Sequence, residues 1–469
     1  MKKFIVEELK GILESDLISF HMPGHKSGKI YNQLGYEDIL KEIYKMDITE
    51  IPGTDNLHSP DGIIKKSQER AAKVFKSKNT YYLVNGSTCG IQSAIMSVCN
   101  PGDKIIVNRD CHQSVINSCI LGNIEPVYVK PIICKKTSIL CGLDPLKVKN
   151  AIDKNLDAKA IVITYPTYYG MTYDLKDICE YAHNNGIVVI VDEAHGAHLG
   201  LSDRLPDTAI ECGADIIVQS THKTLPSFTQ SSMIHMQGDL VDKNKLTNML
   251  SMIESSSPSY ILLSSLEIAV DIYDKYGKSL MENLLKNIDT FKENINHNKC
   301  IEVYDLDDST KIFISLKNLG ITGYYMEKLL RKNYNIQVEL SNYYGVLLIC
   351  TIANQTDDFI SLEKALNDIE KNIKNKDAIE FIEYPTAIPI KKLTPREAFY
   401  REKISIRIQD SVDKICGEYI IPYPPGISLL SPGEIITKEV IDYILLCNKK
   451  GMNISGIKDR NLEFIQVLL

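Results

Sequence analysis

The sequence lacks the features that mark several common protein classes. Its 53 Lys and Arg residues are outnumbered by 60 Asp and Glu residues, and the formal charge of −7 has the wrong sign for whole-surface binding of nucleic acid. No stretch approaches the roughly 18 consecutive apolar residues of a membrane span. The twelve cysteines include no C-x-x-C pair, which argues against a zinc ribbon or a disulfide framework. Because Glu7, Glu8 and Lys10 interrupt the apolar run that a signal peptide needs, we expect a cytoplasmic protein with no nucleic-acid or membrane partner.

What the sequence does contain is a regular alternation of strand and helix patterns. The chain has 469 residues, enough for two or three domains. From about residue 60 to 240, short β-branched runs alternate with helical patterns, which is typical of a parallel sheet covered by helices. We therefore predict an α/β fold with a mostly parallel seven-stranded sheet. Its strands are expected at Tyr81–Val84, Lys104–Val107, Pro126–Val129, Ala160–Thr164, Ile187–Val191, Ala214–Gln219 and Met233–His235.

The rest of the chain predicts smaller α/β domains. A long helix from Pro258 to Tyr276 leads to strands at 311–316, 336–340 and 346–350, with helices at 324–332 and 357–372. The tail from Ala378 is rich in proline and too irregular for a plain sheet or bundle. We expect an N-terminal arm (1–60), a large domain (61–257), a linking helix with a small domain (258–377) and a C-terminal domain (378–469).

Ligands of open parallel sheets bind beyond the carboxyl ends of the strands, so polar residues that follow strands are informative. Asn85-Gly-Ser-Thr-Cys-Gly90 precedes a helix expected to begin near Ile91, and its N–H and hydroxyl groups could hold a phosphate or form an ordinary helix cap. Arg109-Asp-Cys-His112 places a histidine just past another strand. Ser220-Thr-His-Lys223 places a lysine at the end of an apolar strand, where it is suited to a Schiff base.

The turn Asp192-Glu-Ala-His-Gly-Ala-His198 leaves several roles open. Its aspartate could serve a metal, a nucleotide site or the ring nitrogen of a cofactor. A nucleotide-hydrolysing site is disfavoured, because Gly24-His-Lys-Ser-Gly-Lys-Ile30 lacks the spacing of a phosphate-binding loop. A metal site on Asp192, His195 and His198 stays a minority alternative, because no comparable carboxylate cluster completes it. Combined with Lys223 and the Gly86-Ser-Thr88 turn, Asp192 favours an aldehyde cofactor and no metal.

Taken together, these motifs resemble the ornithine/lysine/arginine decarboxylases of the aspartate-aminotransferase fold. The resemblance runs from about residue 19 to 435, and the length is similar to that of the short bacterial arginine decarboxylases. It is carried by His21-Met-Pro-Gly-His-Lys26, Asp47-Ile-Thr-Glu50, Gly53-Thr-Asp-Asn-Leu-His-Ser-Pro-Asp-Gly62, Asn85-Gly-Ser-Thr88, Asp192-Glu-Ala-His-Gly-Ala-His198, Ser220-Thr-His-Lys223 and Pro422-Tyr-Pro-Pro-Gly-Ile427.

The resemblance implies a pyridoxal phosphate enzyme. Lys223 would carry the Schiff base, Asp192 would pair with the pyridine nitrogen and His112 would stack on the ring. The residues around the cofactor would further include Gly86, Ser87, Thr88, His195, Ser220 and His222. For the cationic end of a basic substrate, Asp55, Asp61 and Glu434 are candidates whose structural roles are favoured, and His25 and Lys26 are as readily structural.

The hypothesis is decarboxylation of arginine to agmatine for polyamine supply, by a homodimer or larger homo-oligomer. Lysine or ornithine is the alternative substrate. An aminotransferase is disfavoured because Arg331, in a helix pattern, is expected to face solvent. A cofactor-binding protein without catalysis and a metal-dependent hydrolase remain the rival classes.

Overall fold

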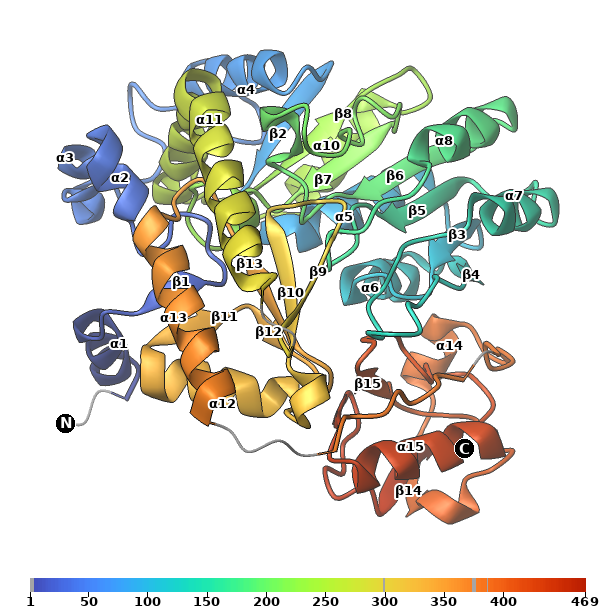
Figure 1. Ribbon diagram of the computed structural model, residues 1–469. Helices are drawn as coiled ribbons and strands as arrows, with labels where there is room; N and C mark the ends of the chain where they lie inside the picture. The colour runs from blue at the N-terminus through green and yellow to red at the C-terminus, as the bar shows by residue number, and fades with distance from the viewer. Residues whose placement is uncertain (1–3, 298–299, 373–376, 386) are drawn as a thin grey trace.

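The structure is a computed structural model that describes residues 4–297, 300–372, 377–385 and 387–469 (Figure 1). The large sheet and its helices occupy the upper part of the view. Helices α12 (Gly323–Tyr334) and α13 (Thr356–Asn372) lie at the lower left, and α14 (Pro395–Tyr400) and α15 (Lys438–Lys449) lie at the lower right.

The large sheet has seven strands, as predicted. Their order is β2-β8-β7-β6-β5-β3-β4, and only β8 runs antiparallel to its neighbours within this sheet. Every residue of β6 and β7 is buried, because helices cover both faces of the sheet. The strands are β2 (Asn79–Leu83), β3 (Lys104–Asn108), β4 (Glu125–Val129), β5 (Ala160–Thr164), β6 (Val188–Asp192), β7 (Ile216–Gln219) and β8 (Ser232–Met236).

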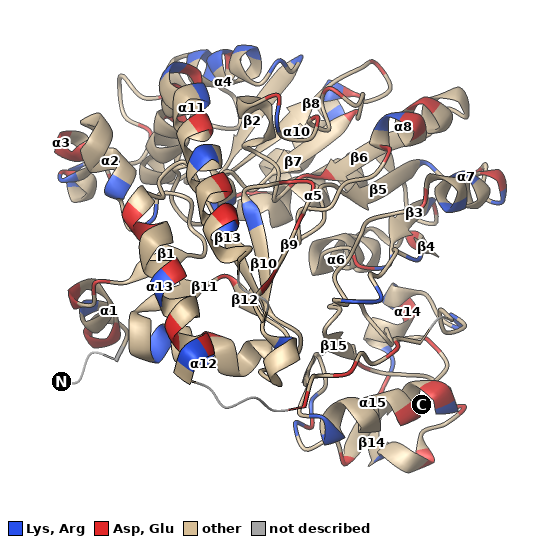
Figure 2. Cartoon of the chain, in the orientation of Figure 1, with Lys and Arg blue, Asp and Glu red and all other residues tan. Residues whose placement is uncertain are grey.

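Helices connect these strands and carry the surface charge. The connecting helices are α5 (Gly86–Val98), α6 (Gln113–Gly122), α7 (Pro145–Asp153), α8 (Leu175–Asn184) and α9 (Thr221–Thr224); α4 (Ile63–Val74) precedes the sheet and α10 (Lys243–Ile253) follows its last strand. Figure 2 shows acidic and basic residues along the outer helices α4, α8, α11 and α13, whereas β5 and β7 contain none. The helices therefore turn their charged faces to water, and the apolar strands between the helix layers form the core.

The long helix α11 (Tyr260–Ile295) extends 19 residues beyond the predicted end at Tyr276, so that prediction was wrong. Gly277, the residue after the predicted end, packs closely instead of ending the helix: a Cβ atom there would lie 2.4 Å from Cδ2 of Leu201. The glycine therefore lets the helix approach the loop at Leu201 instead of ending it. Although α11 has 36 residues, no helix within the described ranges is long and apolar enough to cross a membrane.

The small domain is built on an antiparallel sheet with the order β12-β13-β10-β9. The strand predicted over 336–340 divides at Glu339 into two strands, β11 and β12. In a second, two-stranded sheet, β1 pairs in parallel with β11, which joins the N-terminal segment to this domain. The strands are β1 (Ile18–Phe20), β9 (Glu302–Tyr304), β10 (Lys311–Ser315), β11 (Ile336–Val338), β12 (Leu340–Ser341) and β13 (Val346–Ile349).

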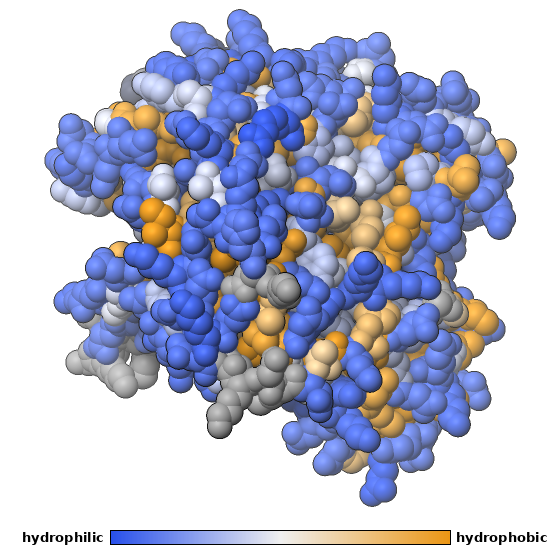
Figure 3. Space-filling view, viewed as in Figure 1, coloured by the Kyte–Doolittle hydropathy of each residue, from blue (hydrophilic) through white to orange (hydrophobic). Residues whose placement is uncertain are grey.

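The C-terminal segment has two small antiparallel sheets, and its Ile420, Leu430 and Ile444 belong to an apolar cluster that also includes Tyr169 and Phe313 from the rest of the chain. These pair β14 (Lys403–Arg407) with β17 (Phe464–Leu468), and β15 (Ile421–Tyr423) with β16 (Asn453–Ser455). The predicted boundary at residue 377 adjoins residues 373–376, which lie outside the described chain. Figure 3 shows a mostly hydrophilic face, with hydrophobic residues gathered in the hollow between the upper and lower parts.

Candidate active site

A cavity of about 690 Å³ lies at the carboxyl ends of β3, β5, β6 and β7. The parallel strands direct their ends to one edge of the sheet, so turns that are far apart in the sequence meet there. The cavity is lined by all nine residues predicted for the site: Gly86, Ser87, Thr88, His112, Asp192, His195, Ser220, His222 and Lys223.

One end of the cavity is suited to an anion. Helix α5 begins at Gly86, five residues before the predicted start, so Ser87 and Thr88 belong to its first turn. The Asn85 side chain does not cap this helix, because its amide oxygen accepts a hydrogen bond from the Ser255 N–H. The first-turn N–H groups therefore face the cavity edge without a side-chain acceptor. The Ser87 hydroxyl is hydrogen-bonded to the hydroxyls of Ser220 and Ser232.

Lys223 lies in the short helix α9, directly after β7. Its Nζ atom is 2.9 Å from Nε2 of His195, which places the amine beside the turn that follows β6. Burial lowers the pKa of the Lys223 ammonium, an effect opposed by the Asp192 carboxylate. A buried amine with a lowered pKa is a better nucleophile near neutral pH.

Asp192 and His112 line the same cavity from the ends of β6 and β3, which β5 separates in the sheet. Asp192 is the last residue of β6, is 5% exposed, and accepts a hydrogen bond from the Ala194 N–H at 3.2 Å. His112 caps α6, and its Nδ1 atom accepts from the Ser114 N–H, which leaves the ring proton on Nε2. Burial lowers the pKa of His112 despite the nearby Asp192 carboxylate, so a neutral ring is favoured.

His195 lies between Lys223 and an aromatic wall. The Tyr168 ring meets the His195 ring edge-on, with the centroids 4.6 Å apart. Burial and the charges of Lys223 and Lys311 lower the pKa of His195 well below its ordinary value. Its Nδ1 atom is buried and has no hydrogen-bond partner in the described part of the chain. His195 is therefore a neutral hydrogen-bond acceptor for the Lys223 amine.

Sequence reasoning missed several lining residues: Asp110, Tyr168, Tyr169, Leu340 and Tyr423. The two tyrosines follow β5, and the rule that polar residues after strands form sites could have found them. Asp110 is two residues from His112, and Tyr423 is in the Pro422–Ile427 motif, to which no role was given. Leu340 carried no local signal, because it comes from the small domain.

Two of the three carboxylates considered for binding a substrate cation have structural partners. The Asp55 carboxylate accepts from the N–H groups of Gly62 and Ile64 and so caps α4. Glu434 forms a two-pronged ion pair with Arg109, at 2.5 and 2.7 Å. Asp61 is exposed, and none of these three carboxylates lines the cavity.

The basic residues considered for substrate contact lie outside the cavity lining. His25 accepts a hydrogen bond from the Gly28 N–H, and Lys26 donates to the carbonyl of His21. Arg331 is half-buried, with its Nη1 atom out of solvent, so the expectation that it faces solvent was wrong.

The alternative metal site is not assembled. His198 directs Nε2 to Asp308, 3.2 Å away, and His195 directs Nε2 to Lys223. Within the described ranges, no three His, Cys, Asp or Glu side chains are grouped to hold a metal ion.

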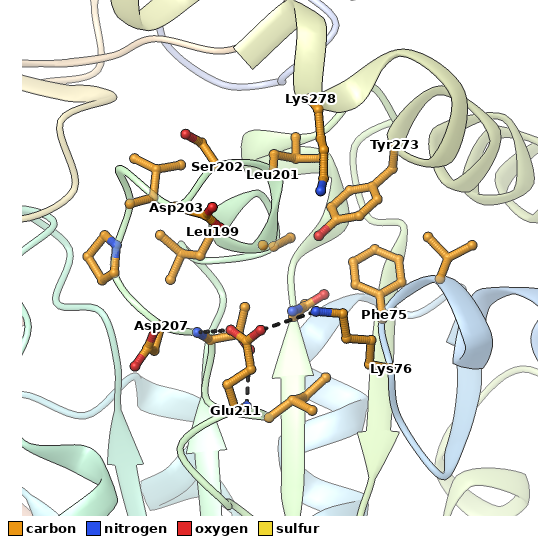
Figure 4. A pocket seen from close by; sticks show the side chains of 18 of the residues that line it. Phe75, Lys76, Leu199, Leu201, Ser202, Asp203, Asp207, Glu211, Tyr273 and Lys278 are labelled. Carbon is orange, nitrogen blue, oxygen red and sulfur yellow. Dashed lines mark hydrogen bonds and ion pairs between the residues drawn. The ribbon is translucent and has the colours of Figure 1, made fainter. Parts of the chain in front are cut away.

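A second cavity, of about 340 Å³, contains none of the predicted site residues (Figure 4). Tyr273 and Lys278 of α11 line one side, and Lys76 and Glu211 line another. Glu211 accepts hydrogen bonds from Lys76 Nζ at 3.4 Å and from Thr208. Of these two cavities, the first therefore holds the residues suited to a cofactor.

Comparisons with known proteins agree with this geometry. Sequence models described as "Orn/Lys/Arg decarboxylase, major domain" and "Orn/Lys/Arg decarboxylase, C-terminal domain" match residues 5–313 and 381–460. The arginine decarboxylase of Bacillus subtilis is 36% identical, and that of Bacillus anthracis 37%. Each match covers 96% of this chain and 94% of the relative.

Among solved structures, the constitutive lysine decarboxylase of E. coli matches with a TM-score of 0.80 at 21% identity, over 96% of this chain and 79% of that one. Lysine decarboxylase A from Pseudomonas aeruginosa matches with a TM-score of 0.79 at 19% identity, over 96% and 78%. These likenesses support the α/β fold. Because the major-domain match spans more than half of the sequence, the chain belongs to the Orn/Lys/Arg decarboxylase family.

Proposed function

We propose that this protein is a pyridoxal phosphate-dependent decarboxylase that converts L-arginine to agmatine and carbon dioxide. The observation that carries the proposal is the meeting of Lys223, Asp192 and the first turn of α5 around one cavity. The preference for arginine rests on relatives: those named arginine decarboxylase are 36–37% identical, whereas those named lysine decarboxylase are 22–23% identical.

The residues present fit this cofactor. The uncapped N-terminus of α5, with the hydroxyls of Ser87 and Ser220, supplies donors for a phosphate. Asp192 supplies a buried carboxylate for a pyridinium nitrogen, and Lys223 supplies the amine that binds the aldehyde. His112, just beyond the end of β3, supplies a neutral ring that can stack on the cofactor.

When bound, the cofactor supplies an electron sink for the charge left on the α-carbon as carbon dioxide departs. The protein's contribution is orientation and electrostatics. Asp192 holds the proton on the ring nitrogen, because a carboxylate next to it stabilises the protonated form. His112 fixes the plane of the ring, and His195 holds the free Lys223 amine in position.

The cavity suits a substrate with a cationic end. Its walls include Tyr168, Tyr169 and Tyr423, whose ring faces attract guanidinium groups. Asp110 is the acidic lining residue besides Asp192, and it accepts a hydrogen bond from the Asn108 amide at 2.8 Å. A buried cation is costly without a partner, so this negative charge favours a basic substrate over a neutral one.

We further propose a cytoplasmic homodimer that supplies agmatine for polyamine synthesis. Helix α1 (Phe4–Glu14) supports an interface between copies, because Ile5 is 75% exposed, Leu9 53% and Leu13 83%. Apolar side chains that gather along one exposed helix mark a contact surface. Light scattering coupled to size-exclusion chromatography should give twice the mass of one chain, and Leu9→Glu/Leu13→Glu should lower it to one.

The direct test uses purified protein loaded with pyridoxal phosphate and supplied separately with arginine, lysine and ornithine. We expect carbon dioxide release to be fastest with arginine, and borohydride reduction to fix the cofactor on Lys223. Lys223→Ala should abolish both, whereas the control Lys78→Ala, which removes a surface ion pair with Asp239, should abolish neither. Pyridoxamine phosphate without carbon dioxide would indicate an aminotransferase. An adduct with no reaction of any amino acid would indicate a binding protein.

A further inference from the structure

A buried ion pair lies beneath the turn that carries His195. Lys311 opens β10, and Asp308 lies three residues earlier. Both side chains are 0% exposed, and the Lys311 ammonium is in contact with the Asp308 carboxylate. The pair belongs to the small domain, yet it packs against the turn that follows β6 of the large sheet.

The pair holds this turn at two points. Lys311 Nζ donates to the backbone carbonyl of His195 at 3.1 Å. The Asp308 carboxylate lies 3.2 Å from Nε2 of His198 and also accepts from the Thr310 hydroxyl at 2.6 Å. Both histidines of the turn are therefore anchored to the small domain.

The anchored turn contacts the reactive lysine through the His195 side chain. His195 accepts from Lys223 Nζ at 2.9 Å, and the edge-on Tyr168 ring limits the rotation of its imidazole. A shift of the His195 backbone would therefore move the acceptor away from the amine. Neither Lys311 nor Asp308 lines the cavity, so the turn is their structural connection to the site.

Stability alone is a poor explanation for such a pair. A buried ion pair is often no more stabilising than apolar side chains of similar volume, because both charges lose their hydration. What a buried pair provides is a fixed geometry, since few arrangements satisfy both charges.

We propose that Lys311 and Asp308 are positioning residues that fix the Asp192–His198 turn and so hold His195 against the Lys223 amine. The role in catalysis rests on the proposed function, because it concerns the lysine that binds the cofactor. Capture of the cofactor by the apoprotein should then depend on a pair of charges supplied by the small domain.

The test compares wild type with Lys311→Met/Asp308→Asn. Removing only Lys311 would leave a buried carboxylate without its cation, so the double variant is used to preserve folding. The first readout is hydrogen–deuterium exchange of peptides covering residues 192–201. The second is the rate at which apoprotein captures pyridoxal phosphate at Lys223, measured by borohydride trapping and peptide mass analysis.

We expect faster exchange in the 192–201 peptides and capture that is slower by roughly tenfold, a typical effect of losing a supporting hydrogen bond around a reactive group. His195→Phe keeps a ring but removes the acceptor, and it should slow capture by a similar factor. Because both changes act on one contact, combining them should add little further slowing. Effects that multiply would overturn the proposal.

The matched control is Lys149→Met/Asp177→Asn, which removes an ion pair between α7 and α8 by the same substitutions. It should leave the exchange of 192–201 and the capture rate unchanged. If wild type forms no adduct at Lys223, the proposed function fails, while exchange still reports on the anchoring. If the adduct forms, but the double variant matches wild type in exchange and capture, the positioning role alone is refuted.

Discussion

We predict that the ion pair between Arg109 and Glu434 contributes strongly to the stability of the contact between the C-terminal segment and the large sheet. The two side chains are 3% and 1% exposed, and Arg109 also donates Nε–H to the Ser428 carbonyl at 3.0 Å. Glu434→Leu leaves the Arg109 guanidinium buried without its carboxylate. Breaking one side of a buried pair costs about 3–5 kcal/mol.

This cost should be visible in thermal unfolding. For a cooperative unit of about 150–250 residues, 1 kcal/mol shifts Tm by roughly 2–4 °C, so Glu434→Leu should lower the first transition by about 6–20 °C. Arg109→Met/Glu434→Leu removes both buried charges and should recover most of that loss. Circular dichroism melts of the three proteins measure the effect.

Two outcomes would refute this reasoning. If Glu434→Leu melts within about 2 °C of wild type, the Arg109 guanidinium has become solvated in the variant. The ion pair then does not stabilise the attachment of the C-terminal segment. If the double variant is less stable than the single one, the cost comes from lost packing and not from the unpaired charge.

Three further predictions concern the site and its supports. Asp192→Asn should keep cofactor binding, measured by absorbance, but lower kcat by roughly 10²- to 10³-fold, because it removes the charge that stabilises the protonated ring nitrogen. Asp55→Ala should lower the unfolding free energy by about 1–3 kcal/mol, because the α4 N–H groups lose their acceptor. Burial raises the pKa of Asp55, but backbone donors such as Asp61 N–H outweigh it and the net pKa is lowered. The carboxylate's contribution is thus full above its ordinary pKa and lost in acid, so the difference between the Asp55→Ala and wild-type denaturation curves should narrow as pH falls below about 4. Gly24→Ala would place a Cβ atom 2.4 Å from the Leu225 carbonyl oxygen. That clash should displace the end of α9 and slow cofactor capture by about tenfold, as followed by absorbance.

The large sheet could be predicted from the sequence because its strands are apolar on both faces. Runs such as Ala160–Thr164 and Val188–Asp192 have no alternative to burial, and the residues that follow them must lie at one edge of the sheet. That simple geometry explains why all nine predicted residues line one cavity.

Other features depend on contacts that no local pattern contains. The helix predicted to end at Tyr276 continues through Gly277, where Leu201 of a distant loop packs against it. Likewise, Lys311 reads as an ordinary strand residue, and its partner His195 lies 116 positions away. Leu340 reaches the cavity only because the small domain folds over it. Such long-range placements follow from tertiary packing and not from periodicity.

The segment from Ile18 to Lys26 touches both halves of the molecule. Its strand β1 pairs with β11, and Lys26 Nζ donates to the Ile349 carbonyl at 2.9 Å. These contacts attach the segment to the small domain. Its Gly24 N–H donates to the His222 carbonyl at 2.7 Å, one residue before the reactive lysine. Trimming the protein back to residue 61 would therefore do more than shorten it. It would leave β11 without its partner strand β1. It would also remove the Gly24 hydrogen bond to His222, so α9, which carries Lys223, would lose a contact that supports it.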